Sequence, residues 1–198
     1  TEVLGAGGLT LTCPEGPYAG LTFTVTEDTL VTRRPVTVLT LPLPELDAAH
    51  VCLYWTADGV EVKNLNSAGS PELDGRRLPD RKFVKAPYGS VLRLGGATAA
   101  QLHADGLLIN GAHYPAAAGD VILSGKRLAV YALGEGDKSV SSPHCLLLRE
   151  MGQFAVRDLN SSGGVQVNDM PIGSTNLILS DNDVLRVGDL TIFTCAIG

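Results

Sequence analysis

A spaced pattern of residues around a His occurs twice in the 198-residue sequence, more faintly the first time, at an interval of 94 residues. His50 is followed 14 residues later (64 − 50) by Asn64-Leu65-Asn66-Ser67. His144 is followed at the same distance (158 − 144) by Asp158-Leu159-Asn160-Ser161. An interval of this size is that of a whole domain, because solenoid repeats are about 20 to 50 residues long. The sequence therefore predicts two domains of the same fold.

The length of the chain agrees with this interpretation, since two domains of about 100 residues each match the common size of a domain. The run Val91–Gly95 recurs as Val184–Gly188, at an offset of 93. We place the boundary near Ala104, so that the expected domains are residues 1–104 and 105–198. Hydrophobic residues make up 44% of the chain and charged residues 18%, which is typical of a globular protein.

Short runs of alternating or β-branched residues, separated by Gly, Pro and Asn, predict an all-β fold. Leu9–Cys13 and Leu21–Val25 alternate as half-buried strands do, with a Gly/Pro turn between them. Asp58-Gly59 indicates a tight hairpin. The segment from Ala97 to Asp105 has the composition of a helical turn, but it also lies where one repeat passes into the next. We expect two tandem β-sandwiches and no long amphipathic helix.

The charge of the chain argues against nucleic-acid binding, which needs a basic field. The formal net charge is −6, and both predicted domains are acidic. One local exception is a basic run that comprises Arg76, Arg77, Arg81, Lys82 and Lys85. It is either a solvated loop or a contact for an acidic partner or for lipid headgroups.

Four cysteines, Cys13, Cys52, Cys145 and Cys195, lie in apolar runs and lack a C-x-x-C spacing. We expect them to be reduced core residues, which favours a cytoplasmic location. No run approaches 18 apolar residues and no signal peptide opens the sequence, so an attachment to a membrane is expected only through additional sequence. No motif implies a cofactor.

The stretch from Val140 to Asn168, VSSPHCLLLREMGQFAVRDLNSSGGVQVN, resembles the signature of the forkhead-associated (FHA) domain. That signature has a Ser and a His in one turn, two strands, a D-L-x-S segment, an N-G pair and a final V-N. FHA domains hold phosphothreonine in their loops. The resemblance implies a tandem pair of degenerate FHA-like β-sandwiches.

In the second domain, the resemblance implies a phosphopeptide site built from Ser141, Ser162 and either Lys126 or Arg127. The Asn of the N-G pair, which holds the peptide backbone in the family, is replaced by Gly163. His50, His144 and Asn168 match signature positions with structural roles. About half of a phosphate site therefore remains.

The first domain departs further from the family. Asp47 occupies the position of the signature Ser and would repel a phosphate, and Ala48 and Ala68 remove donors. Only Arg33 or Arg34 matches the family's arginine. We do not expect this domain to bind a phosphopeptide.

No catalytic or metal-binding constellation is found. The histidines are dispersed, and no acid is placed to orient His144 beside Ser141 as a triad requires. Gly125-Lys126 lacks the remainder of a P-loop. The segment Asp181–Asp183 coincides with a turn of the FHA family, which makes a structural turn the preferred interpretation over a calcium site.

The function expected from the sequence is a non-catalytic protein-interaction scaffold. Degenerate FHA pairs of this length resemble the cytosolic N-terminal region of type VII secretion translocases of the FtsK/SpoIIIE class, which implies docking within a larger membrane ATPase. The alternative is phosphothreonine-peptide binding by the second domain in signalling. Expected partners are therefore proteins, including a phosphothreonine peptide.

Overall fold

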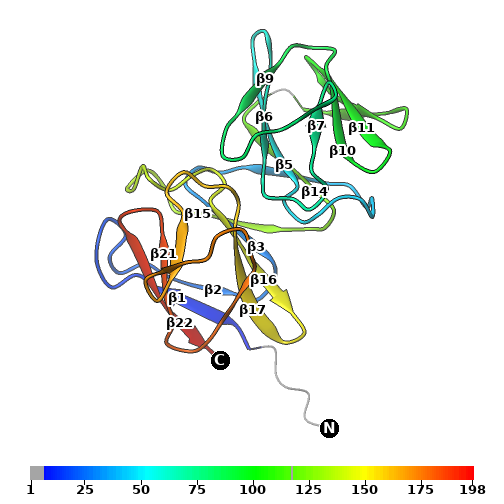
Figure 1. Ribbon diagram of the computed structural model, residues 1–198. Coiled ribbons are helices and arrows are strands. Elements are labelled where there is room, and N and C mark those ends of the chain that lie inside the picture. Colours follow the sequence, from blue (N-terminus) through cyan, green and yellow to red (C-terminus); the bar gives the residue numbers. More distant parts are fainter. Residues whose placement is uncertain (1–6, 117) are drawn as a thin grey trace. The chain divides into compact units, whose positions relative to one another are not determined.

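The computed structural model describes residues 7–116 and 118–198, and these residues form strands and turns without any helix. They divide into two compact units. Unit 1 consists of Thr1–Pro35 together with Leu128–Gly198, and unit 2 is the continuous segment Val36–Arg127. The expected all-β class is confirmed (Figure 1). No helix that could span a membrane occurs among the described residues.

Unit 1 contains a six-stranded and a five-stranded sheet. The order of the six-stranded sheet is β19 (Met170–Pro171), β18 (Val165–Val167), β21 (Val184–Val187), β22 (Thr191–Ile197), β1 (Leu9–Thr12), β2 (Thr22–Val25). The order of the five-stranded sheet is β15 (Ala129–Ala132), β3 (Thr29–Thr32), β16 (Cys145–Glu150), β17 (Gln153–Asp158), β20 (Leu177–Leu179). Strands from the two ends of the sequence lie side by side, since β1 pairs with β22 (Figure 1).

Unit 2 has the same two kinds of sheet. The order of its six-stranded sheet is β13 (Ala112–Pro115), β12 (Gly106–Ile109), β11 (Thr98–His103), β10 (Val91–Gly95), β7 (Glu72–Leu73), β8 (Arg76–Arg77). The order of its five-stranded sheet is β4 (Thr37–Thr40), β14 (Asp120–Ser124), β5 (Val51–Thr56), β6 (Gly59–Asn64), β9 (Val84–Ala86). β11 alternates between buried and half-buried residues, so the helical turn considered for Ala97–Asp105 is wrong.

The two units correspond strand for strand. The strands β4 to β11 of unit 2 correspond, one by one and in the same order, to β15 to β22 of unit 1. For example, β5 has the position in its sheet that β16 has in unit 1. For the remaining three strands, the strands of unit 1 come earlier in the sequence: β1, β2 and β3 of unit 1 correspond to β12, β13 and β14 of unit 2. Unit 1 therefore takes β1, β2 and β3 from the first sequence repeat, and unit 2 takes the equivalent strands β12, β13 and β14 from the second.

These compact units differ from the predicted division into residues 1–104 and 105–198. The physical reason is the parallel pairing of β3 with β15 and of β14 with β4. Only four residues, 33–36, separate β3 from β4, and only four, 125–128, separate β14 from β15. Parallel neighbours need a crossover of about a dozen residues or more. Neither β3 nor β14 can therefore be the parallel neighbour of the strand that follows it, and the partner comes from the other repeat.

Each unit has its own hydrophobic core between its two sheets. In unit 1, Leu9 and Leu11 of β1 pack with Phe193 of β22 and Leu147 of β16, all of them buried. The Phe23 ring stacks on Tyr131 at 3.8 Å between centroids and meets Phe193 edge to face. Because β1 lies between β22 and β2, removal of the N-terminal segment would open this core.

The exchange of strands predicts which fragments fold independently. The fragment 36–127 contains every strand of unit 2, so we expect a cooperative thermal unfolding transition and dispersed amide resonances. The fragment 105–198 lacks β1 to β3, so we expect it to be unfolded or self-associated because its sheets have unpaired edges. A well-folded monomeric 105–198 together with an unfolded 36–127 would contradict the exchange and support the division at residue 104.

Candidate functional site

Three loops at one end of the unit 1 sandwich carry the candidate site. They are the segment after β3, the loop 133–144 between β15 and β16, and the loop 159–164 between β17 and β18. His144 is buried and connects two of these loops. Its Nδ1 accepts a hydrogen bond from Ser141 N (2.9 Å), so Nε2 carries the proton and donates it to the Gly164 carbonyl oxygen (2.7 Å). His144 thus has a structural position.

Ser141 and Ser162 lie together, as the resemblance implied. Their Oγ atoms are 3.3 Å apart, and Ser162 N donates a hydrogen bond to Ser141 Oγ (3.2 Å). Ser162 is exposed and Ser141 is half-buried. The two hydroxyls are therefore close enough to contact one small anion.

The basic residue of this cluster comes from an unexpected part of the chain. Thr32 Oγ donates a hydrogen bond to the Arg34 carbonyl oxygen at 2.6 Å, and Ser124 Oγ donates to the Lys126 carbonyl oxygen at the same distance. Arg34 in unit 1 thus occupies the position that Lys126 has in unit 2. Arg34 N also donates to Ser142 Oγ (2.9 Å), beside Ser141.

Lys126 and Arg127 belong to unit 2. The structure therefore does not bring these two predicted site residues into the unit that carries Ser141 and Ser162. The sequence offered Arg33 and Arg34 as candidates, but it assigned them to the first domain. The difference comes from the expectation that the first three strands of each repeat pack with the rest of the same repeat. The short connections 33–36 and 125–128 are the sequence signal that could have revealed the exchange.

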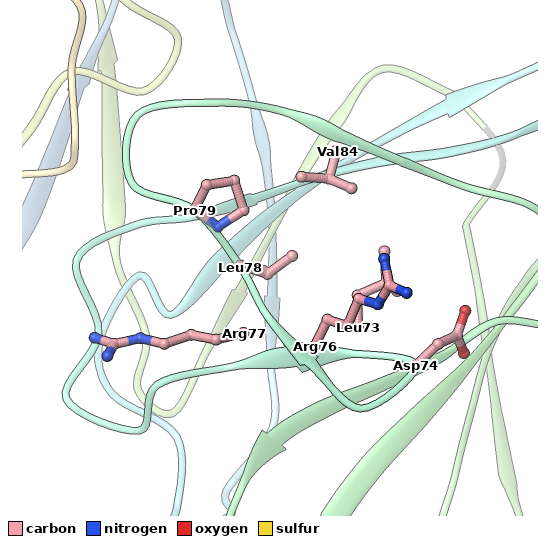
Figure 2. A pocket seen from close by; sticks show the side chains of 7 residues that line it. All are labelled: Leu73, Asp74, Arg76, Arg77, Leu78, Pro79 and Val84. Carbon is pink, nitrogen blue, oxygen red and sulfur yellow. The ribbon is translucent and has the colours of Figure 1, made fainter.

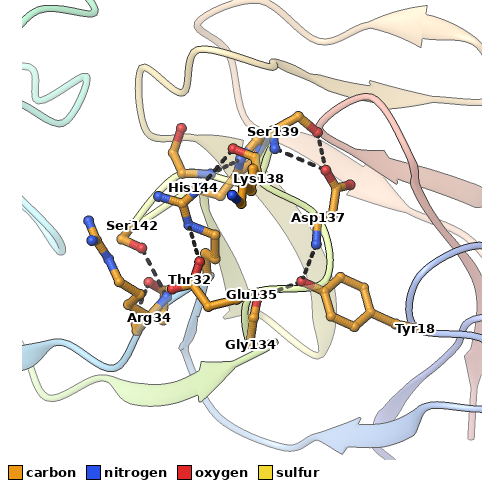
Figure 3. A network of polar contacts seen from close by, with 12 residues as sticks. Tyr18, Thr32, Arg34, Gly134, Glu135, Asp137, Lys138, Ser139, Ser142 and His144 are labelled. Carbon is orange, nitrogen blue, oxygen red and sulfur yellow. Dashed lines mark hydrogen bonds and ion pairs between the residues drawn. The ribbon is translucent and has the colours of Figure 1, made fainter.

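The two neighbouring arginines have different roles. The Arg33 side chain is only 19% exposed, its Nη1 donates to the Lys138 carbonyl oxygen (2.9 Å), and its Nε lies 3.6 Å from a Glu135 carboxylate oxygen. Arg34 is exposed, and its side chain extends away from the polar network of this loop (Figure 3). Arg33 therefore fixes the loop, whereas Arg34 has a guanidinium group that faces solvent.

Asp137 is the centre of the polar network that holds the loop 133–144 (Figure 3). Its carboxylate accepts hydrogen bonds from Ser139 N and Oγ, from Leu190 N and from Thr191 Oγ. Burial by itself raises the pKa of Asp137, but these hydrogen bonds together hold the pKa below its ordinary value. Tyr18 Oη donates to the Gly134 carbonyl oxygen (2.6 Å) and accepts from Asp137 N (3.0 Å).

Gly163 has no space for the Asn that the family carries there. A Cβ atom at this position would lie 2.7 Å from the Ser139 carbonyl oxygen and 2.8 Å from Gly188 Cα. Both neighbours are backbone atoms that a side chain cannot push aside cheaply. The backbone conformation of this loop therefore excludes an Asn side chain at position 163.

The corresponding loops of unit 2 are closed by their own carboxylate. Asp47 Oδ2 accepts a hydrogen bond from Ala68 N (2.7 Å), which is the counterpart of the Ser162 to Ser141 contact. Asp47 N donates to His50 Nδ1 (2.9 Å), and His50 Nε2 contacts the Leu94 carbonyl oxygen. Burial lowers the pKa of His50, although the Leu94 carbonyl and Asp47 oppose this shift. The Asp47 carboxylate therefore already accepts the hydrogen bond that the Ala68 amide would otherwise donate to a phosphate.

The remaining signature residues have structural contacts. Asn168 lies in the turn after β18, where its side chain donates to Asp183 Oδ1 and accepts from Val184 N, both at 2.9 Å. Asp183 also accepts a hydrogen bond from Ser180 N (2.7 Å). Within the described part of the chain, no group of three metal-ligating side chains is found. His50 and His144 use both ring nitrogens in contacts with the backbone, so neither is available as a proton shuttle.

In both β-sandwiches, rigid sheets hold polar loops in place at the ends of the strands, an arrangement that often carries binding residues in proteins. Residues 116–188 match the family profile described as "FHA domain". This part of the chain is therefore similar to an FHA domain. The matched segment begins before β14 and thus includes a strand that belongs to unit 2.

Solved structures of FHA domains are also similar to the chain. One, described as an analysis of phosphothreonine-dependent FHA domain interactions, is 14% identical and covers 96% of this chain and 97% of its own, with a TM-score of 0.38. An FHA domain of an Arabidopsis thaliana hypothetical protein is 13% identical; the match covers 96% of this chain and 85% of that domain, with a TM-score of 0.41. The FhaA FHA domain complexed with the intracellular domain of Rv3910 is 14% identical; the match covers 94% of this chain and 98% of that chain, with a TM-score of 0.36. A comparison with curated proteins finds no match.

The network around Asp137 predicts a measurable contribution to stability. Asp137→Asn replaces a four-fold acceptor with an amide that cannot accept all four hydrogen bonds, so we expect the free energy of unfolding to fall by about 2–3 kcal/mol. Because the folded pKa is lowered, the carboxylate stabilises the fold above about pH 4 and loses this effect as pH falls through the folded pKa. Urea unfolding between neutral pH and about pH 3 measures both effects.

Asp189→Asn is the matched control, because Asp189 is exposed near the same loop. We expect it to change stability by no more than about 0.5 kcal/mol. Equal stability of the Asp137→Asn variant and the unchanged protein would contradict the central role of this carboxylate.

Proposed function

We propose that the chain is a non-catalytic protein-interaction module of two tandem FHA-like repeats, and that unit 1 binds a phosphothreonine peptide. The observation that supports this most directly is the position of Arg34. The segment after the exchanged strand β3 places the backbone N of the exposed Arg34 2.9 Å from Ser142 Oγ, next in sequence to Ser141, whose Oγ lies 3.3 Å from Ser162 Oγ. A phosphate carries nearly two negative charges and needs fixed donors and an arginine fork.

In this proposal each residue of the site has a separate role. The Arg34 guanidinium neutralises the phosphate, and the hydroxyls of Ser141 and Ser162 donate to its oxygen atoms. His144 and Asp137 keep the loops in place without contact to the ligand. The peptide backbone is held weakly because Gly163 has no space for an Asn side chain.

The test is binding of a phosphothreonine peptide pool to the whole chain, with the unphosphorylated pool as control. We expect Arg34→Ala or Ser141→Ala to weaken binding by about tenfold or more, since hydrogen bonds to a charged group contribute about 1.5–3 kcal/mol. Lys126→Ala is the matched control because Lys126 has the equivalent position in unit 2, and we expect it to leave binding unchanged. Loss of binding in Lys126→Ala and not in Arg34→Ala would exclude this site.

Phosphate-independent docking is the second candidate function. It is favoured by the closure of the unit 2 loops by Asp47 and by the lack of space at Gly163. This candidate expects equal binding of the phosphorylated and unphosphorylated pools. It would make the chain a scaffold whose loops no longer distinguish a modified peptide.

The place of the module in the cell is a separate proposal. Because tandem degenerate FHA pairs of this length resemble the cytosolic part of type VII secretion translocases, we propose that the chain belongs to such a membrane ATPase. The native polypeptide that contains this sequence can be isolated under denaturing conditions and analysed by mass spectrometry. We expect peptides of FtsK/SpoIIIE-class ATPase modules in the same polypeptide, and a native polypeptide without them would contradict the proposal.

A further inference from the structure

Unit 2 contains a pocket that is remote in sequence from the loop site of unit 1. Its volume is about 520 Å³, and it is formed by the β7–β8 hairpin, the loop after β8 and the start of β9. The hairpin turns through Asp74 and Gly75, whose φ angles of 47° and 81° are those of a two-residue type I′ turn. This turn fixes one wall of the pocket.

The floor of the pocket is apolar and continuous with the core of unit 2. Leu73 and Leu78 are buried members of that core, and Val84 packs against it. Pro79 forms a further wall (Figure 2). The pocket therefore offers an apolar surface of the kind that a ligand side chain can cover.

Two cationic residues lie beside this apolar floor. Arg76 and Arg77 line the pocket and extend in opposite directions from β8 (Figure 2). The segment 76–85 holds five of the 15 Lys and Arg residues of the chain and one acidic residue, Asp80. Lys85 is paired with Asp58 at 2.7 Å, and among the described residues no ion pair is found for Arg76, Arg77, Arg81 or Lys82. The Asp74 carboxylate also lines the pocket; it accepts a hydrogen bond from Val91 N (2.8 Å), and among the described residues it forms no ion pair with either arginine.

The charge is concentrated at this place in the chain. Unit 1 has 6 Lys and Arg residues against 12 Asp and Glu residues, which gives −6, whereas unit 2 has 9 against 9. The corresponding segment of unit 1, residues 170–179, contains no charged residue. The basic surface is therefore a property of unit 2 alone and is not required by the fold.

We propose that this pocket binds an acidic peptide segment that carries an apolar side chain. The apolar side chain covers Leu73, Leu78 and Val84, and the flanking carboxylates face Arg76 and Arg77. A lipid surface fits less well, because insertion needs a projecting apolar group and the exposed ring of Phe83 lies over the Lys63 ammonium at 5.5 Å. A concave apolar floor with a basic rim suits a peptide.

The experiment measures fluorescence anisotropy of a short labelled peptide with a central Leu flanked by Asp and Glu, bound to the whole chain. We expect saturable binding that weakens as salt increases. The double variant Arg76→Gln/Arg77→Gln should weaken binding by about tenfold or more, since exchange of two rim charges removes the attraction. The control Arg157→Gln/Arg186→Gln makes the same charge change in unit 1 and should leave binding within about twofold.

Two further measurements test the apolar part. Val84→Phe fills the pocket and should weaken binding, with thermal unfolding used to verify that the variant is folded. A peptide in which Ser replaces the central Leu should also bind more weakly, and this result does not depend on the folding of a variant.

Three outcomes would overturn the proposal. They are equal binding by the Arg76→Gln/Arg77→Gln variant, equal binding of the Leu and Ser peptides, and binding only to phosphatidylserine vesicles but not to the peptide. Salt-dependent self-association without peptide binding would also overturn it, because the acidic partner would then be unit 1 of a second copy. Arg34→Ala should have no effect on this peptide, so failure here is distinguishable from failure of the phosphothreonine site.

Discussion

The central position of two strands, β1 and β3, is the constraint on which the rest of unit 1 depends. β1 lies between β22 and β2, and β3 lies between β15 and β16. Without them both sheets would have unpaired edges inside the sandwich, and buried backbone groups without partners are costly. Unit 2 has the same requirement for β12 and β14. Neither core can close until the chain has supplied strands from both repeats.

This exchange also determines the chemistry of the loops. Arg34 reaches Ser142 because β3 pairs with β16 and β15, and not because the two residues are close in sequence. Arg33 holds the loop at Lys138 and Glu135, whereas Arg34 is exposed. In unit 2, the carboxylate of Asp47 meets the amide of Ala68 instead. Two similar frameworks therefore present different loop surfaces.

The sequence predicts the fold class well, because alternating strands and turn residues are local signals. It places Ser141 beside Ser162 because both belong to one contiguous signature. It groups Lys126 and Arg127 with Ser141, whereas Arg34 is the residue that lies in unit 1 with Ser141, because the pairing of β3 is a non-local property that no local pattern encodes. The lack of space at Gly163 could not be predicted either, since it depends on the backbone of Ser139 and Gly188. The pocket near Arg76 also depends on how a loop folds over the core.

The short connections 33–36 and 125–128 have a consequence for how such a chain could change over generations. A genetic breakpoint near residue 104, where the sequence repeat ends, would separate both sandwiches from strands that they require. Breakpoints near residues 35 and 127 would instead transfer unit 2 as an intact body and leave unit 1 to be rejoined across a gap. The two repeats therefore have to be inherited together. A substitution at Arg34, which lies in the first repeat, alters a surface of unit 1 that is formed mainly by residues of the second repeat.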